Sequence, residues 1–135
     1  MLFRSRVGKS GLVHLDTHIV CWLYEGRTEL LTPAALQAIE SGLLQVSPVV
    51  QLELAYLHEI GRISREGSYV LDTLAKDIGL SVADVSLAQV MKMAGTLTWT
   101  RDPFDRMIVA HAMVADVALV SKDRLIRKHC DRAIW

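Results

Sequence analysis

Two aspartates follow short apolar runs that are typical of buried strands. Asp16 comes directly after residues 12–15, and Asp123 comes three positions after residues 117–120. Ligands of open α/β sheets bind at the carboxyl ends of the strands, so both carboxylates are well placed for chemistry. Each aspartate could equally be the N-cap of the helix that follows it. Taken singly, each residue leaves both interpretations open.

Glu53 is harder to explain as an ordinary helix residue. Pro48 predicts the start of a helix, and the helical pattern continues to about residue 60. On a helical wheel Glu53 falls within an apolar stripe that comprises Val49, Val50, Tyr56, Leu57 and Ile60. A glutamate that faces a core must be paired, protonated or bound to a metal ion. The sequence therefore favours a role for Glu53 in a functional site.

Asp102 and Asp105 lie at the start of another helix. Asp102 followed by Pro103 predicts an N-cap and a first helical residue, and the helix beyond them is apolar nearly all round. Asp105 falls in the first turn, where free N–H groups and the helix dipole favour a carboxylate. The spacing of three residues is compatible with a capping box. It is also compatible with Asp105 as a metal ligand and Asp102 as the cap that supports it.

The four acids Asp16, Glu53, Asp105 and Asp123 suggest one kind of chemistry if they converge. Their mutual repulsion would raise their pKa values unless a cation neutralised them. Oxygen ligands without Cys or His neighbours favour Mg²⁺ or Mn²⁺ over zinc. Such a cluster is suited to the metal-assisted hydrolysis of a phosphodiester by a metal-activated water.

The elements that must position these acids alternate along the chain. Strands are predicted at 12–15, 43–46, 80–82, 117–120 and 133–135, and helices at 18–23, 33–42, 48–60, 67–78, 86–97, 103–115 and 124–129. Short apolar strands that alternate with helices predict an α/β fold with a parallel sheet covered on both faces. Residues 1–11 show no periodicity and are expected to form a disordered or extended arm before a single domain over 12–135.

Composition limits the class of protein. The chain of 135 residues has 15 Lys and Arg against 15 Asp and Glu, so nucleic-acid binding would need a local basic patch. Its two cysteines are far apart, which favours reduced thiols. No apolar run approaches the roughly 18 residues that span a bilayer, and the N-terminus lacks the pattern of a signal peptide. We therefore expect a cytoplasmic protein that does not enter the membrane.

Four segments carry a family resemblance when they are taken together. They are LDTH at 15–18, SPVVQLEL at 47–54, RDPFDRM at 101–107 and LVSKD at 119–123. In this order and spacing they resemble the PIN-domain ribonucleases, and in particular the VapC-type toxins of bacterial type II toxin–antitoxin pairs. The resemblance extends from residue 12 to the end of the chain. It implies a three-layer α/β/α fold around a central, mostly parallel sheet.

The resemblance also implies roles for particular residues. The acidic quartet of the family falls on Asp16, Glu53, Asp105 and Asp123, which would act as catalytic residues and metal ligands. Thr17, Asp102 and Ser121 would support them. The implied activity is an Mg²⁺- or Mn²⁺-dependent endoribonuclease acting on RNA. The implied partners are a cognate antitoxin, whose C-terminal segment blocks the active-site groove, and a second copy in a homodimer.

Two arginines and two alternative functions have to be weighed beside this resemblance. Arg106 and Arg124 lie next to two of the acids and are candidates for contact with RNA phosphates, although solvated helix faces explain most cations of this region.

A phosphatase related to the haloacid dehalogenases would need a second Asp two residues after Asp16, where His18 stands. The non-enzymatic alternative is a PIN-like scaffold that binds RNA or a protein without cleavage. Acids at all four positions argue against that scaffold.

Overall fold

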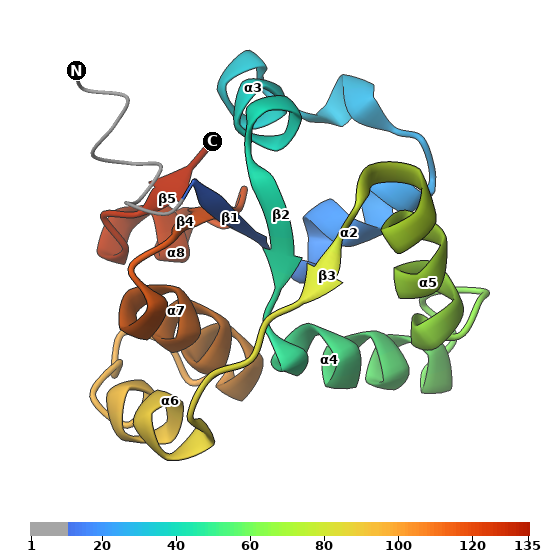
Figure 1. Cartoon of the computed structure of the whole chain (residues 1–135). Helices are drawn as coiled ribbons and strands as arrows, with labels where there is room; N and C mark the ends of the chain where they lie inside the picture. The colour runs from blue at the N-terminus through green and yellow to red at the C-terminus, as the bar shows by residue number, and fades with distance from the viewer. Residues whose placement is uncertain (1–10) are drawn as a thin grey trace.

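The computed structural model of the protein describes residues 11–135 (Figure 1). The arm expected over residues 1–11 therefore lies, apart from Gly11, outside the described residues, and its boundary stays a prediction. The domain expected from residue 12 onward begins with a strand at Leu12. Within the described part of the chain, no helix is long and apolar enough to cross a bilayer.

A sheet of five parallel strands forms the centre of the fold, as the sequence predicted. The strand order is β3-β2-β1-β4-β5. The strands are β1 (Leu12–Leu15), β2 (Leu43–Val46), β3 (Ser81–Val82), β4 (Ala118–Val120) and β5 (Ala133–Ile134). β1 and β4 are buried along nearly their whole length, which explains why they are apolar apart from His14 of β1. Leu15 pairs with Val120, so the two central strands end side by side.

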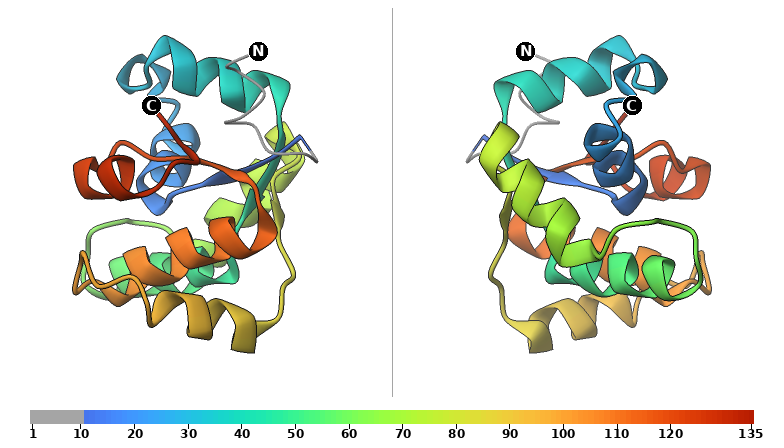
Figure 2. Two further views of the ribbon diagram at one scale, coloured as in Figure 1. Left: turned by 90° about the vertical axis from the view of Figure 1, so that its left-hand side faces the viewer. Right: turned by 90° about the vertical axis from the view of Figure 1, so that its right-hand side faces the viewer.

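Helices cover both faces of this sheet and give the three-layer α/β/α architecture. Figures 1 and 2 show α3 on one side of the sheet, α4 and α7 on the other, and α6 packed outside α7. The helices are α2 (Thr17–Tyr24), η1 (Thr28–Leu30), α3 (Pro33–Ser41), α4 (Pro48–Glu59), α5 (Gly67–Ile78), α6 (Leu87–Ala94), α7 (Pro103–Ala115) and α8 (Arg124–His129). Among these, the short 3₁₀ helix η1 had no counterpart in the sequence pattern.

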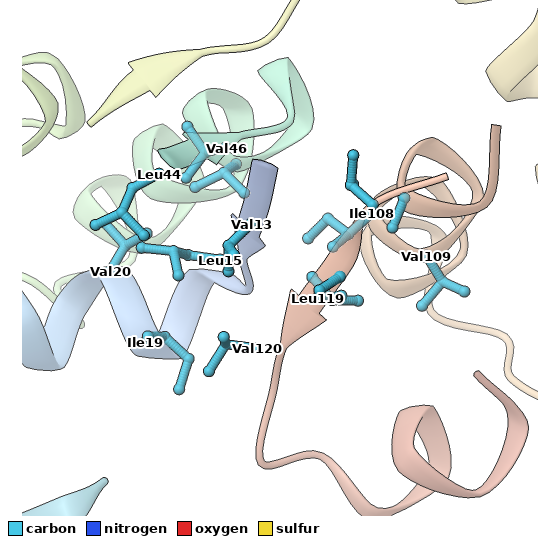
Figure 3. Close-up of a cluster of buried hydrophobic side chains, with 14 of the residues drawn as sticks. Val13, Leu15, Ile19, Val20, Leu44, Val46, Ile108, Val109, Leu119 and Val120 are labelled. Atoms are coloured by element: carbon cyan, nitrogen blue, oxygen red, sulfur yellow. The ribbon is translucent and has the colours of Figure 1, made fainter. Parts of the chain in front are cut away.

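The core lies between the central strands and the helices that flank them. Figure 3 shows Val13 and Leu15 of β1 near Leu119 of β4, with Ile108 of α7 close to that strand. All four side chains are at most 1% exposed. Burying such a side chain contributes about 1.5–3 kcal/mol, so β1, β4 and α7 form a stiff base for whatever projects from their ends.

Two histidines lie inside this core and face each other. His14 of β1 and His111 of α7 are each 1% exposed, and their rings meet edge to face with centroids 4.8 Å apart. Nε2 of His111 is buried without a hydrogen-bond partner, and at His14 only the side chain of Gln45 opposes the effect of burial on the ring. Burial lowers the pKa of both rings, that of His14 to about 4, where repulsion from His111 adds to the effect.

Candidate active site

The site lies between β1 and β4, where the order of consecutive strands along the sheet changes direction. From β1 the chain continues to β2 on one side, whereas from β4 it continues to β5 on the other. Such a switch point leaves a crevice at the carboxyl ends of the two strands. Asp16 follows β1 there, and Asp123 lies three residues beyond β4. The backbone N–H of Asp16 donates to the carbonyl of Val120 at 3.0 Å, which joins the two strand ends.

Asp16 is almost completely buried, with 5% of its surface exposed. Its Oδ1 accepts a hydrogen bond from the backbone N–H of Thr17 at 2.8 Å, and its Oδ2 accepts one from the hydroxyl of Ser121 at 2.7 Å. These bonds favour the charged carboxylate, but burial outweighs them and raises its pKa. Asp16 is also the N-cap of α2, which confirms that expectation, while its role in catalysis stays a prediction.

Glu53 reaches the same region from α4. Its Oε1 accepts a hydrogen bond from the hydroxyl of Thr17 at 2.5 Å, so Thr17 links Glu53 to the end of β1. Burial raises the pKa of Glu53, and the negative charges of Asp16 and Asp102 raise it further. Thr17 is thus confirmed as a neighbour of the acids, and its hydroxyl holds one of them in place.

The apolar stripe proposed for the Glu53 helix is only partly correct. The buried side chains of α4 are Val50 and Leu54, whereas Tyr56 and Ile60 are 47% and 48% exposed. Glu53 therefore lies at the border between the buried and exposed faces of α4, with its carboxylate half-buried. The wheel assigned the wrong centre to the stripe, because it shows which residues share a face of the helix but not which face packs against the core.

Asp102 and Asp105 stand at the start of α7. Asp102 is the N-cap, as predicted, and its Oδ1 accepts from the backbone N–H of Phe104 at 2.9 Å and of Asp105 at 3.3 Å. No reciprocal bond from the Asp105 side chain to the Asp102 N–H is seen; that N–H instead donates to the hydroxyl of Thr100 at 3.2 Å. The capping box is therefore not formed, and the Asp105 carboxylate is left for another role.

Asp105 lies near enough to the other acids for their charges to affect its pKa. Burial raises the pKa of Asp105 to about 7, and four further carboxylates add to the rise: Asp102, Asp16, Asp123 and Glu53. Three of these charges come from N-caps, Asp16 of α2, Asp102 of α7 and Asp123 of α8, and the fourth comes from Glu53 in the middle of α4.

Ser121 connects the two strand ends through its hydroxyl. It donates to Oδ2 of Asp16 and accepts from the backbone N–H of Asp123 at 3.1 Å, and it is completely buried. Asp123 in turn caps α8 by accepting from the N–H of Ile126 at 3.0 Å. The supporting role expected of Ser121 thus corresponds to two specific contacts.

The donor set suits a divalent cation by its chemistry. Buried or half-buried carboxylates with raised pKa values need positive charge, and the ion pairs found within residues 11–135 join other residues, Arg27 with Glu29 and Arg132 with Asp116. Oxygen ligands of this kind fit Mg²⁺ or Mn²⁺. The side chains are not arranged as a formed metal site, however. Within residues 11–135, no three Asp, Glu, His or Cys side chains lie close enough together to hold an ion. The metal ligands therefore stay a prediction.

The two arginines proposed to contact RNA differ in their surroundings. Arg106 is half-buried, and its Nε donates to the carbonyl of Thr100 at 2.8 Å, which fastens the loop before α7. Arg124 is exposed at the first position of α8, beside Asp123. Arg106 therefore has a structural function, and its contact with RNA stays a prediction like that of Arg124.

Comparison with solved structures supports the fold. The chain superimposes on a chain of a toxin–antitoxin complex from Klebsiella pneumoniae with a TM-score of 0.67 and 16% sequence identity, covering 91% of this chain and 96% of that one. It also superimposes on a chain of VapBC2 from Rickettsia felis bound to a promoter DNA fragment, with a TM-score of 0.60 and 19% identity over 87% and 92% of the two chains.

Sequence comparison identifies the family. Ribonuclease VapC22 of Mycobacterium tuberculosis is 35% identical over 125 residues, which is 87% of this chain and 91% of that protein. The PIN-domain family matches residues 13–131, a range that contains all four acids and the strands and helices that carry them. With the five-stranded parallel sheet and the acids at its switch point, these matches show that the chain belongs to the PIN-domain family.

Proposed function

We propose that this protein is a divalent-metal-dependent endoribonuclease and the toxin of a toxin–antitoxin pair. The observation that carries the proposal is the placement of Asp16 and Asp123 beyond the ends of neighbouring strands, where Ser121 joins them, together with the pKa of Asp105, which burial and the charges of Asp102, Asp16, Asp123 and Glu53 raise to about 7. Membership of the PIN-domain family and the relationship to a ribonuclease VapC support the same activity. A scaffold without catalysis would have no need to keep mutually repelling carboxylates in a partly buried site.

In this proposal Asp16, Glu53, Asp105 and Asp123 hold Mg²⁺ or Mn²⁺. When bound, such an ion lowers the pKa of a water molecule and offsets the charge that develops on the phosphate. The protein's own contribution is rigidity: Ser121 fixes Asp16, Thr17 fixes Glu53, and the Asp102 cap fixes the first turn that carries Asp105. In the overall hydrolysis, the water oxygen bonds to phosphorus, and the leaving oxygen takes the broken bond's electron pair and a proton.

The test is cleavage of total bacterial RNA, with the new ends mapped by sequencing. We expect the wild-type protein to cut at defined positions with Mg²⁺ or Mn²⁺ and to stop when EDTA is added. Asp16→Asn and Asp105→Asn should each abolish cleavage. Because each variant removes a charge from a self-repelling cluster, the fold should remain intact or become slightly more stable. Wild-type rates in either well-folded variant would refute the proposed metal site.

The partners follow from the same proposal. We expect an antitoxin whose C-terminal segment blocks the groove at the acids, and a homodimer as the assembly of the toxin. The solved relatives from Klebsiella pneumoniae and Rickettsia felis are described as toxin–antitoxin complexes, which supports such a partner. We also expect the protein to act in the cytoplasm, where its RNA substrate is found. Both cysteines are free thiols in the structure, which suits a reducing compartment.

A further inference from the structure

A pocket of about 510 Å³ lies beside the acidic site, between α2, α4 and the loop that joins α4 to α5. This volume falls within the range of about 300–1,000 Å³ that is usual for small-molecule sites. The lining includes His18, Cys21 and Tyr24 of α2, Leu57 of α4, and Arg62 and Arg65 of the loop. None of these residues is one of the proposed catalytic acids or of the residues that support them.

The pocket shares two helices with the acids. On α2, His18 directly follows Thr17 and Cys21 follows it by four residues, and on α4 Leu57 follows Glu53 by four residues. One helical turn advances about 5.4 Å, so Cys21 and Leu57 lie about one turn along their helices from Thr17 and Glu53. The pKa of the Cys21 thiol supports this closeness: it is raised to about 11 by burial and by the charges of Glu25, Glu53 and Asp16.

The pocket has a positive side, unlike the site next to it. Its charged lining residues include Arg62 and Arg65 against the single carboxylate of Glu25. Both arginines are exposed, and in the described part of the chain neither takes part in an ion pair. An arginine guanidinium binds a phosphate through two parallel hydrogen bonds.

The loop that carries the arginines is fastened to α4. The backbone N–H of Arg62 donates to the carbonyl of Leu57 at 2.8 Å, and Nδ1 of His58 lies 3.2 Å from the carbonyl oxygen of Ile63. Gly61 makes the turn with a φ of 78°, a left-handed conformation that glycine adopts at low cost. Because the loop is ordered in advance, a ligand would lose less entropy on binding to it.

An aromatic pair borders the same pocket. The guanidinium carbon of Arg65 lies 3.7 Å from the ring centre of Tyr69, and the ring of Tyr69 meets that of Tyr24 edge to face at 6.3 Å. Tyr24 lines the pocket and is only half-buried. Tyrosine rings stack on nucleobases of any sequence. The pocket thus combines a surface for a base with cations for a phosphate.

We propose that this pocket binds a nucleotide of the substrate strand next to the phosphate that is cut. Arg62 and Arg65 contact the backbone phosphate of that nucleotide, and Tyr24 stacks on its base. The pocket thereby positions the strand so that the neighbouring phosphodiester lies over the acids. This inference rests on the proposed ribonuclease function and adds to it the residues that hold the RNA.

The test measures binding without cleavage. A labelled short single-stranded RNA is titrated with protein in EDTA at several salt concentrations, and fluorescence anisotropy gives the affinity. We expect Arg62→Ala and the double variant Arg62→Ala/Arg65→Ala to weaken binding several-fold. The slope of log affinity against log salt should become shallower by about 0.7 for each phosphate that the variant no longer binds. Tyr24→Ala should also weaken binding, whereas Tyr24→Phe, which keeps the ring, should not.

Lys92→Ala is the matched control, because it removes an exposed positive charge from α6, outside the pocket. The proposal is overturned if the arginine variants, folded as judged by circular dichroism, bind RNA as the Lys92 variant does while the wild-type protein still cuts RNA with Mn²⁺. It is also overturned if they keep RNA affinity and lose only antitoxin binding. A wild-type protein that neither binds nor cuts RNA would refute the proposed function and this subsite together.

Discussion

Single hydrogen bonds decide how firmly the acids are held, and Asp102 is the clearest case. Asp102→Ala removes the bonds from the N–H groups of Phe104 and Asp105. The free energy of unfolding should fall by about 1 kcal/mol, as for other N-caps. RNA cleavage should fall roughly 10- to 100-fold, the range found when groups that orient metal ligands are removed. Chemical denaturation and single-turnover cleavage measure the two effects.

Asp102→Asn separates the cap from its charge. Asparagine is as good an N-cap as aspartate, so stability should return to the wild-type value. Activity should also return if Asp102 acts only by positioning Asp105. If Asp102→Asn instead stays folded and loses all metal binding, Asp102 is itself a ligand and its assignment as a cap is incomplete.

Glu53 provides the sharpest separation of a metal ligand from a packing residue. Glu53→Leu removes a half-buried carboxylate whose pKa is raised by burial, so the metal-free protein should melt at the same or a higher temperature. The shift of the melting temperature on adding Mn²⁺ should disappear, because that shift reports binding to the native state as RT ln(1 + [L]/Kd). Glu59→Leu, on the exposed side of α4, should keep the full shift. Equal shifts in all three proteins would show that Glu53 does not bind the ion.

At the scale of elements, the close approach of α4 and α5 depends on Gly67. A Cβ added there would lie 2.7 Å from the Cβ of Leu54, and neither atom can rotate away. Gly67→Ala should therefore push the helices apart and lower the free energy of unfolding by about 1–3 kcal/mol, as other overpacked sites do. The α4–α5 loop and its pocket would shift with them. Urea denaturation followed by circular dichroism measures the change.

Gly95→Ala is the matched control for this substitution. At Gly95 the nearest atoms to a new Cβ are backbone oxygens at 3.6 Å, an ordinary contact, and its φ of −61° suits alanine. This change should leave stability unchanged or raise it by about 0.4–1 kcal/mol through the unfolded chain. A Gly67→Ala protein as stable as Gly95→Ala would show that α4 and α5 can move apart at little cost.

The sequence predicted the elements well because caps and apolar runs are local signals. Pro48 and Pro103 mark helix starts that the structure confirms, and the central strands β1 and β4 are apolar apart from His14. The strand order could not be predicted from the sequence, because the pairing of β1 with β4 joins residues more than a hundred positions apart. The pocket could not be predicted for the same reason: Arg62 and Arg65 look like ordinary loop cations until the fold places them in one pocket with Tyr24 of α2 and Leu57 of α4.

For the site as a whole, the sequence located the acids from their places at strand and helix ends. The family resemblance named Thr17, Asp102 and Ser121 as their supports but did not show which acid each of them contacts. The bonds from Ser121 to Asp16 and from Thr17 to Glu53 link residues 105 and 36 positions apart. The exposure of Tyr56 and Ile60 was also missed, because a helical wheel shows which residues share a face but not which face packs against the core.

For the whole molecule, the buried histidine pair predicts a loss of stability in acid. The pKa of His14 is lowered to about 4 and that of His111 is also lowered, whereas both return to about 6.5 in the unfolded chain. Between pH 4 and pH 6.5 the unfolded state therefore binds more protons than the native state does. The free energy of unfolding is highest above pH 6.5, as far as these two groups decide it, and falls progressively toward pH 4. Each histidine contributes a slope of up to about 1.4 kcal/mol per pH unit.

The acidic site titrates in the opposite sense, so the test compares two proteins that both contain it. The raised pKa of Asp105 makes the metal-free native state less stable as the pH increases toward 7. His111→Leu removes one buried base and also relieves the repulsion that lowers the pKa of His14. Measured in EDTA, the free energy of unfolding of His111→Leu relative to wild type should therefore increase as the pH falls from 6.5 to 4. Parallel stability curves over that interval would show that the histidines become protonated without unfolding the core.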